Sequence, residues 1–201
     1  MSKKTTTPAT STPAAAATTS GVVFTDQTLR TAAGLAADGY RPVWVGRSGE
    51  QSSGASVARH LQAAIALLDQ DGWIGTHSCT TDTDGLEVPD DDSMTVKAML
   101  KTLLRLVRDE FGGGDKRRTL SSALRHVGEE GVHGDSDTAY VADAVLDLII
   151  RAHTGAETAY AAVWSERVGR THADVTALLR AGAEFARTYG PSAHGTQAQA
   201  A

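Results

Sequence analysis

Cysteine is nearly absent from this 201-residue chain, which contains only Cys79. A single thiol cannot form an internal disulfide, so the sequence shows no sign of the disulfide framework of small secreted domains. No window holds about 18 consecutive apolar residues, so we expect no membrane-spanning helix and no membrane partner. The basic start at Lys3 and Lys4 leads into Thr and Pro rather than an apolar run, which argues against a signal peptide. We therefore expect the protein to stay in the cytoplasm, or in a particle assembled there.

Aromatic residues are scarce as well, at 5% of the chain, whereas hydrophobic residues together make up 41%. An alanine-rich chain with few aromatic side chains favours closely packed helices over large sheets. The formal net charge is −5. This charge excludes a generally basic protein that coats nucleic acid, but it leaves room for a local basic patch.

The composition changes along the chain and predicts four regions. Residues 1–20 are almost entirely Thr, Ala, Ser and Pro. Such a stretch cannot bury enough apolar surface to offset its ordering entropy, so we expect a disordered tail. A helix followed by a Gly/Ser linker is expected over residues 21–55, a helical domain over residues 56–190, and a short second tail over residues 191–201.

Apolar residues at helical spacing predict a mainly α fold, a compact bundle of about six or seven helices. The expected helices cover residues 26–38, 56–71, 94–111, 119–130, 137–153, 156–167 and 171–189. The fifth of them is apolar on most sides and should be the central buried helix. The Asp84-Gly85 turn signal predicts a minor β-ribbon near residues 73–89. Trp73 and Trp164 are expected to be buried anchors of the core.

Recognisable catalytic motifs are missing from the sequence. No nucleophile elbow, phosphate-binding loop or dinucleotide fingerprint is present, so we expect no cofactor and assign no catalytic residue. Acidic residues crowd the stretch 82–92, and His77 and Cys79 lie just before it. The acidic stretch lacks EF-hand spacing, and one His with one Cys falls short of a zinc site. We therefore predict no metal site.

One stretch of the chain carries a basic stripe. Lys97, Lys101, Arg105 and Arg108 recur at spacings of four, four and three, which places them on one face of a helix. Such a stripe can meet DNA phosphates or an acidic partner. The alternative is the charged outer face that amphipathic helices commonly turn to water.

Residues 164–180 supply a second nucleic-acid signal. The small, glycine and apolar positions of a helix-turn-helix would be Ser165, Gly169 and Val175. The recognition helix of this motif would offer only His172, Thr176 and Arg180 as polar readers, and Arg170 is a further candidate contact. Arg170 stands where an apolar residue is usual, and few of the others suit base reading. An ordinary pair of packed helices joined by a glycine turn remains the alternative.

Two blocks of sequence resemble an uncharacterised actinobacterial family that is known only as a domain of unknown function and also occurs in phages and plasmids. The first runs from His60 to Leu68 and continues to Asp71-Gly72-Trp73. The second comprises Val163-Trp164-Ser165, Gly169-Arg170-Thr171, Asp174-Val175 and Leu178-Leu179. Family members tend to have Asn where Ser165 stands, and a cysteine-containing segment that this chain lacks. The resemblance implies a compact helical fold and supplies no activity.

These observations favour a non-catalytic interaction or accessory protein, which binds a protein partner or assembles with itself. Its resemblance to phage and plasmid sequences suggests an origin in a mobile element. A DNA-binding regulator that uses the basic stripe or residues 165–180 is the second interpretation. A metal-dependent or thiol enzyme built on His77, Cys79 and the acidic stretch is the third.

Overall fold

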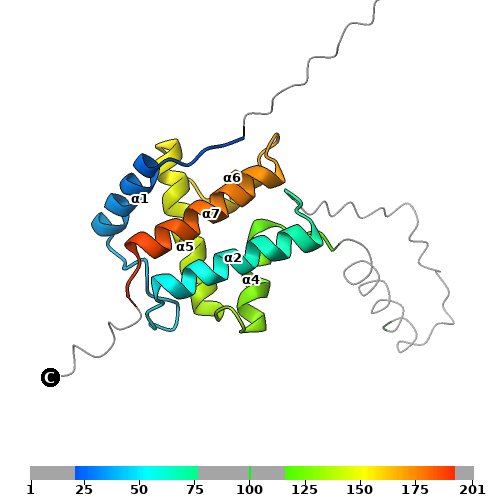
Figure 1. Cartoon of the computed structure of the whole chain (residues 1–201), viewed down its shortest axis with the longest axis horizontal. Helices are drawn as coiled ribbons and strands as arrows, with labels where there is room; N and C mark the ends of the chain where they lie inside the picture. Colours follow the sequence, from blue (N-terminus) through cyan, green and yellow to red (C-terminus); the bar gives the residue numbers. More distant parts are fainter. Residues whose placement is uncertain (1–20, 77–99, 101–115, 193–201) are drawn as a thin grey trace, which may run out of the picture.

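The computed structural model describes residues 21–76, 100 and 116–192. These residues contain six helices: α1 (Asp26–Asp38), α2 (Gly54–Asp71), α4 (Leu120–Glu130), α5 (Ser136–Thr154), α6 (Ala161–Ser165) and α7 (His172–Tyr189) (Figure 1). The predicted mainly α fold class is confirmed. Four expected features lie wholly or mostly outside the described residues: the tail 1–20, most of the tail 191–201, all of the helix 94–111 except residue 100, and most of the ribbon 73–89.

The long helices begin where the sequence offers a side chain that can accept from their first backbone N–H groups. The N-cap residues of α1, α2, α4, α5 and α7 are Thr25, Ser53, Thr119, Asp135 and Thr171, and each side chain accepts from the N–H three residues on. At α7 the exchange is reciprocal, because Asp174 also accepts from the backbone N–H of Thr171. The reciprocal pair of Thr171 and Asp174 is a capping box, which satisfies two backbone donors at the start of α7.

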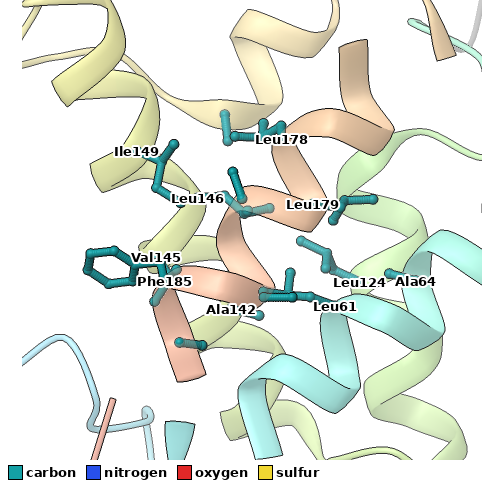
Figure 2. Packing of buried hydrophobic residues seen from close by; sticks show 14 of the residues in the cluster. Leu61, Ala64, Leu124, Ala142, Val145, Leu146, Ile149, Leu178, Leu179 and Phe185 are labelled. Atoms are coloured by element: carbon teal, nitrogen blue, oxygen red, sulfur yellow. The ribbon is translucent and has the colours of Figure 1, made fainter. Parts of the chain in front are cut away.

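Helix α5 lies at the centre of the bundle and contacts the other five described helices. Its buried residues include Val145, Leu146 and Ile149. Figure 2 shows these side chains meeting Leu61 of α2 and Leu178 of α7, among others. Helix α5 is therefore apolar nearly all round because neighbours surround it, as its sequence pattern predicts.

Helices α2 and α7 run antiparallel, side by side, and share the largest helix–helix interface among the described residues (Figure 1). Small residues allow the close approach. A Cβ atom on Gly54 would lie 2.1 Å from the carbonyl oxygen of Ala186, and one on Gly182 would lie 2.6 Å from Cδ2 of Leu146. Neither position has room for a side chain, so glycine fixes how closely α7 packs on its neighbours.

Helix α1 and the residues before it pack on the same core. Leu29 and Ala32 are buried members of the hydrophobic cluster. The Phe24 ring centroid lies 4.9 Å from that of His153 and 5.9 Å from that of Trp164. The 21–38 segment thus contributes apolar side chains to the same bundle as the later helices.

The sixth helix is shorter than predicted. The pattern predicts a helix over residues 156–167, but α6 covers only Ala161–Ser165. Two side chains of α5 hold the preceding backbone in a non-helical path. Arg151 Nε donates to the carbonyl of Ala159 at 3.2 Å, and Asp147 Oδ1 accepts from the N–H of Ala161 at 2.7 Å. These tertiary hydrogen bonds override the local helical preference of residues 156–160.

The chain on either side of residues 77–115 is joined by a short clasp, formed by residues 71–74 and Arg118. Arg118 Nε lies 2.7 Å from Asp71 Oδ2, and its backbone N–H donates to Gly72. Ile74 donates in turn to the Arg118 carbonyl, so that Trp73 and Arg118 form a parallel bridge. An antiparallel bridge between Val45 and Gln51 is the other isolated pairing in the described chain.

None of the helices in the described ranges is long and apolar enough to cross a membrane.

Candidate functional site

Several predicted features fall where the structure gives no description. The basic stripe of Lys97, Lys101, Arg105 and Arg108 lies outside the described residues, as do His77, Cys79 and the acidic stretch 82–92. Among residues 21–76 and 116–192, no group of three or more His, Cys, Asp or Glu side chains could hold a metal ion.

Arg170 is placed against the core. Its guanidinium carbon lies 4.0 Å from the ring centroid of Trp164, a stacked cation–π geometry. Trp164 itself is only 1% exposed, because Phe24 meets it from another side. The Arg170 side chain therefore shields the buried indole from solvent. Trp73, the other expected anchor, is half-buried at the edge of the hydrophobic cluster.

The other side chains of the predicted helix-turn-helix are also engaged or buried. His172 Nε2 lies 3.3 Å from Asp69 Oδ1, close enough for an ion pair when the imidazole is protonated, although the groups are not aligned for a hydrogen bond. Thr176 is 7% exposed. Helix α7 packs against α1, α2 and α5, whereas a recognition helix needs a free face along its N-terminal half. Of the predicted readers, Arg180 is left exposed to solvent.

Asp174 joins the cap of α7 to the start of the described chain. One oxygen accepts from the backbone N–H of Val22 at 2.8 Å, and the other accepts from Thr171. Burial raises the pKa of this carboxyl. The hydrogen bonds from Val22 and Thr171 and the nearby Arg170 charge outweigh burial, so the pKa falls below its usual value. Asp174 is thus an ionised structural group.

Two carboxyl groups one turn apart on α5 are held away from water. Burial raises the pKa of Asp143, and the charge of Arg47 opposes the shift. Burial also raises the pKa of Asp147, to about 6, although the hydrogen bond from Ala161 opposes this. Asp147 lies 3.9 Å from Arg151, one turn further along the helix, so this half-buried acid has a base beside it.

His60 is a fully buried histidine between α2 and α4. Its Nε2 lies 3.1 Å from the Leu124 carbonyl, so in the neutral ring this nitrogen carries the proton and donates it. Burial lowers the pKa of His60, which favours the neutral form. This histidine therefore cross-links two helices of the core.

An open groove of about 680 Å³ runs between the outer faces of α2 and α7. Its floor is apolar, formed by half-buried Ile65 and buried Ala183. Its rim is polar and exposed, formed by Gln62, Arg180, Glu184, Arg187 and Thr188. No ion pair or hydrogen bond engages the side chains of Arg180, Glu184 or Arg187 within the described part of the chain. The groove thus brings one predicted residue, Arg180, together with two charged neighbours, Glu184 and Arg187, that no sequence motif singles out.

A smaller polar pocket of about 270 Å³ lies where the chain enters α2 and α5. Its lining is rich in hydroxyl and carboxyl groups, but several of them already serve the fold. Ser53 and Asp135 cap the two helices, and both oxygens of Asp137 accept from Ser48. The larger groove, whose charges remain unused, is therefore the better candidate for a binding site.

The signal for this groove is present in the sequence. Arg180, Glu184 and Arg187 are spaced by four and three residues, which places all three charges on one helix face. What the sequence cannot provide is the position of α2 beside that face, because it depends on tertiary packing at Gly54 and Gly182.

Comparison with known proteins yields one match. No curated protein and no solved structure matches the chain. A family of unknown function, DUF6197, matches residues 52–185, which include helices α2 to α6, α7 as far as Phe185, and both blocks of sequence described above. The matched range covers well over half of the chain, and the protein therefore belongs to this family of unknown function.

Proposed function

We propose that the protein is a non-catalytic binding module that holds an acidic helical segment of a partner protein in the α2–α7 groove. The observation that carries this proposal is the pair of exposed arginines on the groove rim, Arg180 and Arg187. Neither has an ion-pair or hydrogen-bond partner among the described residues. Seven residues along α7 separate them by about 10 Å.

The shape of the groove suits a helix. Two antiparallel helices leave a shallow trough between them, and a third helix can lay its apolar side into it. Ile65 and Ala183 offer the apolar floor that such a segment needs. Acidic residues two turns apart on the incoming helix would match the arginine spacing, since charge-assisted pairs between arginine and carboxylate are the stronger kind of polar contact.

The acid and base groups of the described core support a binding role over a catalytic one. Asp174 is committed to the cap of α7 and to Val22. His60 bonds Leu124, and Asp147 bonds Ala161. Each of these groups has a structural partner and lies apart from the lining of the groove.

An acidic protein segment suits the site better than duplex DNA. Glu184 lies between the two arginines and would face phosphates with its own negative charge. The other two bases of the predicted helix-turn-helix already have neighbours within the protein, since Arg170 lies over the Trp164 ring and His172 lies beside Asp69.

The test is fluorescence anisotropy with a labelled synthetic helical peptide that carries Glu residues two turns apart beside an apolar stripe. Measurements are made at about 0.05 M and about 0.15 M salt, because contacts on an exposed rim are screened. We expect the double change Arg180→Ala, Arg187→Ala to weaken binding by about tenfold or more.

The control is the double change Arg30→Ala, Arg125→Ala, which removes two exposed arginines on α1 and α4 and should leave affinity unchanged. Equal losses in both variants, or no peptide binding by the unaltered protein at the lower salt, would overturn the proposal. Binding of duplex DNA that depends on Arg180 and Arg187, without peptide binding, would replace it with a nucleic-acid function.

A further inference from the structure

The rim of the groove carries charges in a fixed order along α7. Arg180, Glu184 and Arg187 read positive, negative, positive, and their spacing keeps them within about 60° of one another around the helix. The order is therefore presented on one surface, where a bound segment would meet all three charges at once.

These charges do not neutralise one another. Arg180 and Glu184 have the four-residue spacing at which oppositely charged side chains on a helix can pair. Even so, no ion pair within 4 Å joins any two of the three, and no other described residue pairs with them. Each charge is exposed and can interact with a partner across the groove.

We propose, building on the function proposed above, that the partner segment is an amphipathic helix whose charges read acidic, basic, acidic. In a helix parallel to α7 these residues would stand at positions i, i+4 and i+7, and in an antiparallel helix at i, i+3 and i+7. Each partner acid then faces an arginine, and the central base faces Glu184. An apolar residue of the segment packs on Ile65 between them.

Glu184 is the residue that sets specificity in this arrangement. The two arginines alone would accept any acidic helix, whereas Glu184 repels a helix that is acidic at the central position. It also fixes the register, because a segment that slides by one turn brings like charges together. An exposed pair changes affinity by up to about fivefold in either direction, so exchanging an attractive centre for a repulsive one should change affinity by about tenfold at low salt, and by no more than about 25-fold.

The experiment uses two synthetic peptides that differ at one position, with charge order Glu–Lys–Glu or Glu–Glu–Glu on the same face. We expect the full-length protein to prefer Glu–Lys–Glu by about tenfold at about 0.05 M salt. The change Glu184→Lys should reverse the preference, and Glu184→Gln should largely remove it. Comparing protein variants on the same two peptides cancels any difference in peptide helicity.

The control is Glu157→Lys, an equal charge reversal at an exposed residue outside the groove, which should leave the preference as it is. Circular dichroism checks that each variant folds. If the protein binds both peptides equally and needs Arg180 and Arg187 for both, the charge order proposed here is wrong while the proposed function stands. If it binds neither peptide, both proposals fail.

Discussion

Replacing Asp147 by Asn should make the protein more stable at neutral pH. The side chain is only 15% exposed, and burial raises its pKa to about 6 from an ordinary value of 3.8. The folded state thus binds the proton more tightly than the unfolded state does. At 1.36 kcal/mol per pKa unit, ionising this group in the folded protein costs about 3 kcal/mol of stability.

The sign of the pH dependence follows from the direction of the shift. Below about pH 3.8 the carboxyl is protonated in both states, and its contribution to stability is fully present. As the pH rises through about 6, the folded protein loses that contribution. An Asn side chain carries no charge at any of these pH values, and its carbonyl oxygen can still accept from the Ala161 N–H.

The assay is urea denaturation followed by circular dichroism, at pH values from about 4 to about 8. We expect the Asp147→Asn protein to gain little at pH 4 and about 1–3 kcal/mol above pH 7, after allowing for its lost attraction to Arg151. The change Glu157→Gln, in the exposed turn before α6, should show no such trend. A variant that is less stable at pH 7, or whose gain does not vary with pH, would refute the reasoning.

Two further predictions concern packing and are checked by the same denaturation assay. Trp164→Ala should lower the free energy of unfolding by about 3–5 kcal/mol because the indole is buried. Trp73→Ala should lower it by at least about 1 kcal/mol less because that indole is half-buried. Equal losses would contradict this difference in burial. Gly182→Ala should destabilise by about 1–3 kcal/mol, since its new methyl would meet Leu146, while Gly34→Ala on the open face of α1 should stabilise by up to about 1 kcal/mol. A Gly182→Ala protein as stable as the unaltered chain would show that the Leu146 side chain moves aside without a loss of stability.

The helical architecture could be predicted from local signals. Helix α1 covers residues 26–38 as expected, between Thr25 and Gly39, and the Thr171–Asp174 capping box starts α7. Side-chain caps and helix-ending glycines act within a few residues of the backbone they bond, so they can be read from sequence alone. The extent of α6 could not be predicted, because its start is set by Asp147 and Arg151, which lie on α5, 14 and 8 residues before the backbone groups that they bond.

The candidate site was predictable only in part. Arg180 could be named in advance because exposed charge follows from helical periodicity. The roles of Arg170 and His172 could not be predicted, because the sequence does not distinguish a basic side chain that lies over Trp164 from one that is free to bind phosphate. The groove itself depends on how closely α2 approaches α7, and that spacing is decided by glycines far apart in the chain.

The clasp between residues 71–74 and Arg118 has a consequence for how the gene can vary. It joins the end of α2 to the residue pair just before α4 through two backbone hydrogen bonds and the Asp71–Arg118 ion pair. Asp71 and Arg118 are both partly buried, so a change at one of them leaves the other without its charged partner. Substitutions at these two positions should therefore occur together among relatives more often than substitutions at exposed positions of α1.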